Sequence, residues 1–153
     1  AVPAALERGN LIADYTFAKD ALFARLNLDG DELATYQRVH EALAEKIALP
    51  DLMVYLRADT DVLMRRIAVR DRPYERGMER DYINQLGRVY DAFFELSGRD
   101  NRADGPSSPV LTIDTNDMDF VKDGGHLNQI AGRIRAALGL GTYQASLPLM
   151  SRD

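Results

Sequence analysis

At 153 residues the chain is long enough for one ordinary domain with a hydrophobic core and too short for two comfortable ones. Its composition, 46% hydrophobic and 28% charged, is typical of a globular protein, and the formal net charge of -5 disfavours a general nucleic-acid or membrane-surface binder, because both need a basic face. The sequence has no cysteine, which excludes disulfides and thiolate metal sites, and no apolar run approaching the ~20 residues of a membrane span, so we expect a cytoplasmic protein.

The chain begins in what reads as the end of a helix, over residues 1–8, so we expect that a preceding part of the protein is missing from it. The apolar run at residues 11–13 (LIA) predicts a short buried strand. Two helices are expected next. The first is rich in aromatic residues and covers 17–26, and the second begins near Asp31 and ends before Pro50.

The second half of the chain begins with the best strand in the sequence, residues 52–56 (LMVYL), which is apolar throughout, as in a parallel sheet covered on both faces. A helix from about residue 60 should end at Pro73, and another should run from about 81 to 96 with apolar and aromatic side chains at a spacing of three and four. Residues 110–113 (VLTI) form the third predicted strand.

A last amphipathic helix is predicted to end at Leu138, and residues 139–153 show no periodicity, so we expect a domain over 1–138 and a tail over 139–153. Short apolar strands that alternate with helices, without hairpin signals, predict an α/β fold with a parallel sheet and flanking helices. Ligands of such sheets bind beyond the carboxyl ends of the strands, which here are residues 14–15, 57–59 and 114–117, and the first and last of these ends are candidates for a site.

Residues 65–76 (RRIAVRDRPYER), which we call the arginine segment, hold five arginines among twelve residues. Arg66 and Arg70 are four residues apart and share a helix face, where like charges repel unless an anion lies between them. Guanidinium groups bind phosphate oxygens bidentately and stabilise the charge of a transferring phosphoryl group. A solvated basic helix end, stabilised by the helix dipole, explains the spacing equally well.

Three blocks of sequence together resemble the deoxynucleoside kinase family, and within it the bacterial deoxyadenosine/deoxyguanosine kinase branch. They are residues 13–24 (ADYTFAKDALFA), the run from Val54 through the arginine segment to Phe93, and residues 113–120 (IDTNDMDF). Their order and spacing fit the family over roughly residues 1 to 138. The resemblance implies a three-layer P-loop kinase fold whose N-terminal part is missing.

The resemblance implies that the arginine segment is the lid over the phosphate donor. Arg66, Arg70 and Arg72 would be its catalytic residues and would contact the donor phosphates, while Glu75 would reach the sugar of the bound nucleoside. A loop beside the donor adenine would be formed by Asn116, Asp117, Asp119 and Phe120.

In the acceptor site, the resemblance implies that Asp14 would face the nucleoside and that Phe17 would lie near its base. Each role has a competing structural explanation. Asp14 could cap the following helix, Phe17 could belong to the core, and Glu75 could pair with a neighbouring arginine, Arg72 or Arg76. Asp117 and Asp119 could be turn residues or helix caps.

Two features depart from the family pattern. Glu7-Arg8-Gly9 is similar to the family's acidic-Arg-Ser motif, but it precedes the predicted strand at 11–13 instead of ending it, so we interpret it as a helix terminus. The phosphate loop G-x-x-x-x-G-K-[ST] is absent, and with it the lysine for the β/γ-phosphates and the hydroxyl for Mg²⁺. We therefore expect the chain alone to be inactive, with that half of the site encoded upstream.

The leading hypothesis is a kinase that moves the γ-phosphoryl of ATP, or of another nucleoside triphosphate, to the 5'-hydroxyl of a purine deoxynucleoside. Mg²⁺ would be held mainly by residues upstream, since His40 and His126 are isolated and no metal-binding spacing occurs. We expect a homodimer with neither nucleic acid nor membrane as partner. The alternatives are a nucleoside monophosphate kinase of the thymidylate type and a non-catalytic nucleotide-binding or oligomerisation module.

Overall fold

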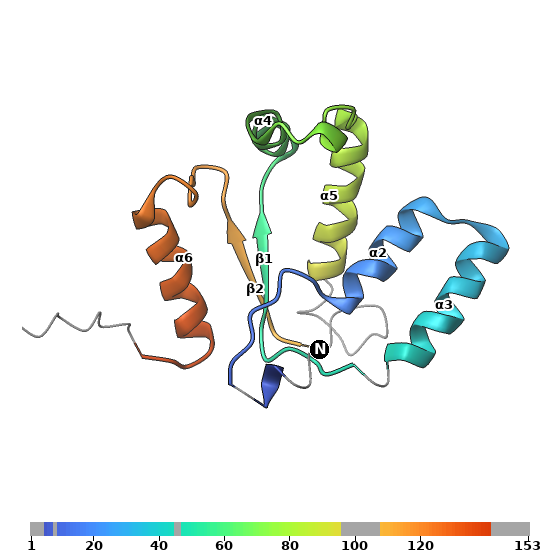
Figure 1. Ribbon diagram of the computed structural model, residues 1–153, viewed down its shortest axis with the longest axis horizontal. Helices are drawn as coiled ribbons and strands as arrows, with labels where there is room; N and C mark the ends of the chain where they lie inside the picture. Colours follow the sequence, from blue (N-terminus) through green and yellow to red (C-terminus); the bar gives the residue numbers. More distant parts are fainter. Residues whose placement is uncertain (1–4, 8, 45–46, 96–107, 142–153) are drawn as a thin grey trace, which may run out of the picture.

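The computed structural model describes residues 5–7, 9–44, 47–95 and 108–141. Apart from the strand predicted at residues 11–13, its helices and strands follow one another in the order expected from the sequence (Figure 1). They are α2 (Phe17–Asn27), α3 (Gly30–Ala44), β1 (Met53–Arg57), α4 (Thr60–Arg70), the 3-10 turn η1 (Pro73–Glu75), α5 (Arg80–Glu95), β2 (Val110–Asp114) and α6 (Gly124–Ala137).

The two strands are parallel neighbours, with Met53 opposite Val110 and Arg57 opposite Asp114. The connection between them runs through α4 and α5, as a parallel pair requires. Ile113 is fully buried on β2. The predicted parallel α/β fold is therefore confirmed for this part of the sheet.

Helices cover both faces of the sheet, which gives three layers (Figure 1). α6 lies on one side, and α5 lies on the other with α2 and α3 beyond it. α5 packs through its aromatic face, since the rings of Phe94 and Tyr55 stack with centroids 4.5 Å apart and Tyr90 lies beside both. No helix in the described ranges is long and apolar enough to cross a bilayer.

The strand predicted at residues 11–13 is wrong. These residues have no regular secondary structure, and Ile12 is 98% exposed. An apolar run indicates that its side chains favour burial, but a strand also needs a neighbouring strand with which to form backbone hydrogen bonds. In the described part of the chain β1 and β2 pair only with one another.

Both strands end at the same edge of the sheet, at Arg57 and Asp114. α4 begins directly beyond this edge, and the arginine segment follows at its far end. The edge is where the topology of a parallel sheet puts a ligand.

Candidate functional site

The arginine segment is half helix and half turn. α4 ends at Arg70, three residues earlier than Pro73 predicted, because Asp71 takes a left-handed conformation (φ 47°) while its N–H still donates to the Ile67 carbonyl at 3.0 Å. An aspartate tolerates this conformation better than most residues. Arg76 grips the same Asp71 carboxylate with two hydrogen bonds of 2.7 and 2.9 Å. The turn redirects the arginines that follow the helix.

Arg66 is bound to the loop after β2. Its guanidinium donates from Nη1 to the Thr115 hydroxyl at 3.0 Å and from Nη2 to the Thr115 and Met118 carbonyls, the latter at 2.9 Å. It also lies 5.6 Å from the centre of the Phe120 ring, within the range of a cation–π contact. The structure thus brings together Arg66 and the segment that includes Asn116–Phe120, two parts assigned separately to the donor side.

Asn116 ties this loop to the start of α4. Its Oδ1 accepts a hydrogen bond from the Asp59 backbone N–H at 2.8 Å, and its own N–H donates to Asp114 at 2.9 Å. These contacts join the ends of both strands at the sheet edge.

Two acidic residues, Asp117 and Asp119, lie in the loop after β2. The side chain of Asp119 stabilises a turn. Its Oδ1 accepts from the N–H groups of Val121 and Lys122 at 3.3 and 3.1 Å. Asp123 caps α6, with its carboxylate accepting from Gly125 at 2.7 Å. Asp117 is exposed. Of the two structural alternatives considered for Asp119, a turn residue or a helix cap, its hydrogen bonds agree with the turn residue.

Arg70 and Glu75 form the more buried of the two ion pairs within the segment. Two parallel hydrogen bonds of 2.9 and 2.8 Å join the guanidinium to the carboxylate, and Glu75 is only 7% exposed while the Arg70 side chain is 50% exposed. The sequence offered Arg72 or Arg76 as the arginine that could pair with Glu75, and the structure selects Arg70 instead. Arg70, which was expected to contact the phosphate donor, and Glu75, which was expected to contact the nucleoside, therefore contact each other.

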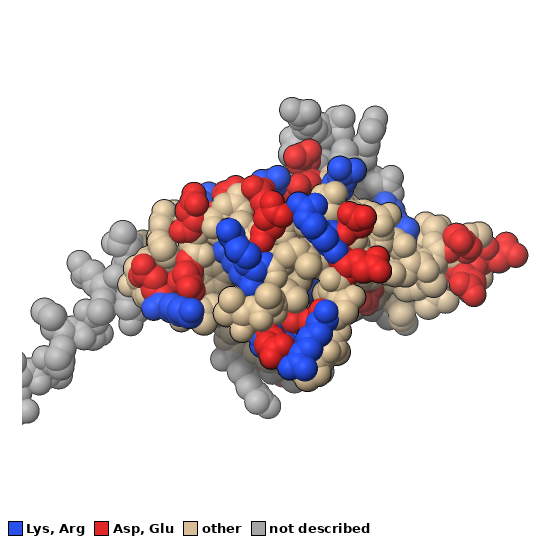
Figure 2. Space-filling view, turned by 90° about the horizontal axis from the view of Figure 1, so that it is seen from above, with Lys and Arg blue, Asp and Glu red and all other residues tan. Residues whose placement is uncertain are grey.

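Arg72 is the outermost of the predicted arginines. It is exposed, lies just before η1 and donates to the Tyr74 hydroxyl at 2.9 Å. Seen from above, the basic side chains lie beside acidic ones, so this face has no large patch of one charge (Figure 2). Within the segment, two of the five arginines are paired with carboxylates, Arg70 with Glu75 and Arg76 with Asp71.

The other two residues predicted for the nucleoside site, Asp14 and Phe17, do not contact the arginine segment. The Phe17 ring, at the start of α2, stacks on His40 of α3 with centroids 4.2 Å apart, which agrees with a packing role. Asp14 is exposed, and the N-cap of α2 is Thr16, so Asp14 is not the cap. Among the described residues, neither Asp14 nor Phe17 forms a hydrogen bond or ion pair with the arginine segment.

Glu7 of the Glu7-Arg8-Gly9 motif lies directly after a short helical segment. The motif was interpreted as a helix terminus because it precedes a predicted strand at 11–13, and that strand is absent. Ala5 and Leu6 are helical and Glu7 is in a turn, while Arg8 lies outside the described residues. The strand on which the interpretation was based is absent, but the helix terminus itself agrees with the structure at Ala5 to Glu7.

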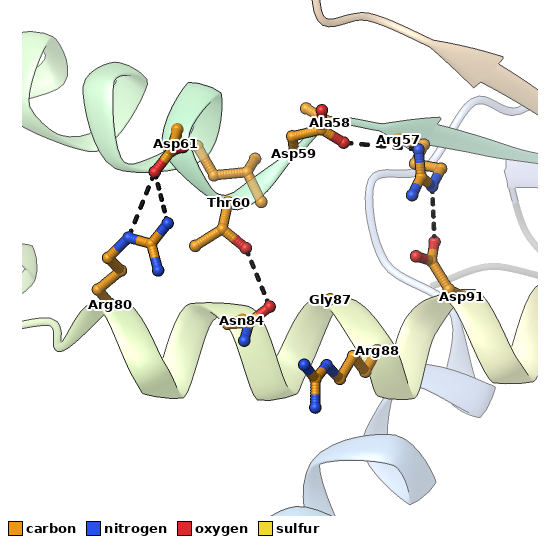
Figure 3. A pocket seen from close by; sticks show the side chains of 11 residues that line it. Arg57, Ala58, Asp59, Thr60, Asp61, Arg80, Asn84, Gly87, Arg88 and Asp91 are labelled. Atoms are coloured by element: carbon orange, nitrogen blue, oxygen red, sulfur yellow. Dashed lines mark hydrogen bonds and ion pairs between the residues drawn. The ribbon is translucent and has the colours of Figure 1, made fainter.

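A pocket of about 360 Å³ opens where β1 meets α4 and α5 (Figure 3). Its charged lining combines Arg57, Arg80 and Arg88 with Asp59, Asp61 and Asp91. The three positive and three negative charges cancel, so the pocket is polar without favouring an anion.

Asp91 lines this pocket, and it was not predicted from the sequence as a site residue. It accepts hydrogen bonds from the Tyr55 hydroxyl at 2.9 Å and from Arg57 Nε at 3.1 Å. Burial, and then the hydrogen bond to Asp91, raises the pKa of Tyr55 well above its usual value. The same carboxylate raises the pKa of Arg57. The only sequence signal for a polar partner here was Arg57, which directly follows the apolar run at residues 52–56.

Replacing Asp91 with alanine should lower the free energy of unfolding by about 2 kcal/mol, because Tyr55 and Arg57 both lose an acceptor at a partly buried site. Urea unfolding at neutral pH measures the loss. Asp61→Ala is the matched control, since its ion pair with Arg80 is solvent-exposed and should contribute less than about 1 kcal/mol. Equal losses for the two variants would contradict the assignment.

No metal site of protein ligands is evident in the ranges that the structure describes, where no three His, Cys, Asp or Glu side chains converge. The chemistry of the edge is instead that of guanidinium groups, which bind phosphate and not metal ions.

Comparison with known proteins agrees with this chemistry. The model of the deoxynucleoside kinase family matches residues 3–138. The chain is 31% identical over 132 residues to a deoxyguanosine kinase of Bacillus subtilis, covering 85% of this chain and 61% of that protein. It is 30% identical to a deoxyguanosine kinase of Lactobacillus acidophilus (76% of this chain, 54% of that protein) and 26% identical to a deoxyadenosine kinase of the same organism (76% and 57%).

The chain thus spans little more than half the length of the curated relatives that it matches. The matched region contains the α/β fold, the arginine segment and the loop after β2, in the order that the sequence blocks led us to expect. The chain belongs to the deoxynucleoside kinase family.

Proposed function

We propose that this chain carries the lid and part of the nucleoside site of a kinase that moves the γ-phosphoryl of ATP, or of another nucleoside triphosphate, to the 5'-hydroxyl of a purine deoxynucleoside. Family membership supports a nucleoside kinase, and the names of the relatives, deoxyguanosine and deoxyadenosine kinases, favour a purine. The observation that carries the proposal is the contact of Arg66 with the loop after β2, because it joins a phosphate-binding segment to a base-binding one.

On the donor side, we assign the phosphates to Arg66, Arg70 and Arg72, and the neighbourhood of the adenine to Asn116, Asp117, Asp119 and Phe120. Arg66 uses three of the five N–H donors of a guanidinium on the loop, so Nε–H and one Nη1–H are left for a phosphate oxygen. The Phe120 ring beside it offers an apolar face for a base.

The lid arginines would act by position and charge. Phosphoryl transfer spreads negative charge over the equatorial oxygens, and preorganised guanidinium groups stabilise that charge in the transition state. Arg70 is half exposed and Arg72 is exposed, so both can turn toward a phosphate at the cost of contacts with Glu75 and Tyr74.

The arginines at the sheet edge suit the phosphates of the donor, and in the described ranges no three His, Cys, Asp or Glu side chains converge on a metal site. Mg²⁺ supplies charge neutralisation between the β- and γ-phosphates in kinases. Guanidinium groups have no lone pair for a metal, so we assign Mg²⁺ mainly to residues outside this chain, together with the phosphate loop that the sequence lacks.

On the acceptor side, we assign Glu75 to the sugar, Asp14 to the rim of the site and Phe17 to the neighbourhood of the base. A carboxylate offers about four lone-pair positions, and Arg70 occupies two of those on Glu75, which leaves room for a sugar hydroxyl. We further propose a cytoplasmic homodimer, with small-molecule substrates and neither nucleic acid nor membrane as partner, consistent with the net charge of -5.

The test is a substrate panel with the full-length gene product, using ATP and Mg²⁺ with the four common deoxynucleosides and their monophosphates. We expect transfer to deoxyguanosine or deoxyadenosine, and no activity from the 153-residue chain alone. Faster turnover of a monophosphate would support a monophosphate kinase instead. Failure with every acceptor, together with no G-x-x-x-x-G-K-[ST] motif encoded upstream, would leave the non-catalytic module.

A further inference from the structure

Thr115 is a fully buried polar residue at the junction of three elements. It follows β2 directly and has no exposed surface. Its backbone N–H and its hydroxyl both donate to the Arg57 carbonyl at the end of β1, at 2.8 and 2.9 Å. Its carbonyl accepts from the Met118 N–H at 3.1 Å and from Arg66 of α4. All its polar groups are used, as burial of a polar residue requires.

The hydroxyl of Thr115 donates one hydrogen bond and accepts another. Because its single hydrogen points to the Arg57 carbonyl, the oxygen presents a lone pair to Nη1 of Arg66, 3.0 Å away. One hydroxyl therefore connects the end of β1 to α4. A valine of the same shape would lose both contacts.

Arg66 is in consequence unlike the other two predicted lid arginines. Its guanidinium plane is held by the Thr115 hydroxyl, the Thr115 carbonyl and the Met118 carbonyl, whereas Arg70 and Arg72 contact only side chains of the turn beyond α4. A group that is already ordered loses less conformational entropy when a ligand binds. Arg66 is built into the sheet edge, and Arg70 and Arg72 are the ones that can move.

We infer that Thr115 is a positioning residue of the donor site, which orients Arg66 and the loop 115–120 for the nucleoside triphosphate. The inference rests on the proposed function, since it names what sets the geometry of the donor side. It makes a directional prediction: loss of the hydroxyl weakens donor binding and leaves the nucleoside site unchanged. A buried threonine with a purely structural role would instead lower stability and affect both substrates alike.

The experiment compares Thr115→Val, Thr115→Ser and Thr112→Val in the full-length gene product. Thr115→Val should raise the KM for ATP about tenfold, the effect of losing a hydrogen bond to a charged group, and change the deoxynucleoside KM less than about twofold. Thr115→Ser keeps the hydroxyl and should restore the wild-type KM for ATP. Thr112→Val is the matched control on the adjoining strand β2, where the threonine side chain is exposed.

A second readout is independent of activity. Amide hydrogen exchange in residues 116–120 should be faster in Thr115→Val than in the wild type, because the loop loses one of its three hydrogen bonds to Arg66 and the hydroxyl bond to the Arg57 carbonyl, and Thr115→Ser should again restore it. An unchanged KM for ATP, or unchanged exchange in this segment, overturns the inference. If the wild type transfers no phosphoryl group, the proposed function fails, and hydrogen exchange alone still decides whether Thr115 holds the loop.

Discussion

Replacing Arg70 and Arg72 together with alanine should lower kcat of the full-length gene product about a thousandfold, because the transition state loses two of its preorganised cationic groups. Both arginines lie at or beyond the end of α4, with solvent-accessible guanidinium groups. Arg70→Lys should recover only a small part of the activity, since an ammonium cannot replace the two-pronged contact that Arg70 makes with Glu75. Steady-state kinetics with saturating ATP and deoxynucleoside measure the loss.

Stability must be separated from catalysis in this variant. Alanine at position 70 leaves the buried Glu75 carboxylate without its partner, so the double variant should also unfold at a lower temperature. Arg72→Ala avoids this problem, because Arg72 contacts only the exposed Tyr74 hydroxyl, and it should still lose about a hundredfold in kcat. Arg38→Ala, an exposed arginine of α3, is the control. Full turnover by Arg72→Ala and the double variant would refute the lid assignment.

The regular part of the fold was predictable because its signals are local. The continuous apolar run of β1 and the spacing of apolar side chains on α5 each determine an element without knowledge of its partners. The run at residues 11–13 carries the same apolar signal, yet it forms no strand and exposes Ile12. Strand formation depends on a neighbouring strand, which a short apolar run does not reveal.

The site was predictable in its residue types and not in its pairings. Helical spacing correctly indicated that Arg66 and Arg70 share a face, but their partners lie beyond the helix. The Arg70–Glu75 pair depends on the left-handed Asp71, which reverses the chain between them. Thr115 reads as a loop residue in the sequence, and its burial comes from Arg57 and Arg66, 58 and 49 residues away. Contacts of this range carry no local signature.

Under the proposed function, Glu75→Gln should abolish most of the preference of the full-length gene product for an acceptor with a sugar 3'-hydroxyl. The 5'-hydroxyl of the acceptor reacts, so the 3'-hydroxyl is the sugar group left to donate to a buried carboxylate. If it bonds to Glu75, the wild type should favour a 2'-deoxynucleoside over its 2',3'-dideoxy analogue by about a hundredfold in kcat/KM, since the analogue removes a hydrogen-bond donor to a buried charged acceptor that Arg70 satisfies only in part. In Glu75→Gln the ratio should fall to about tenfold or less, because the acceptor is neutral.

Glu79→Gln is the matched control, because Glu79 is exposed and precedes α5 by one residue, and it should keep the wild-type ratio. The sugar preference separates the two roles of Glu75. If the carboxylate only restrains Arg70, its neutralisation releases the arginine toward the phosphates, so the KM for ATP changes and the sugar preference persists. If it also binds the sugar, the sugar preference falls in addition to the change in the KM for ATP. A wild type that accepts both analogues equally would contradict a sugar contact, and Glu75 would then be the partner of Arg70 alone.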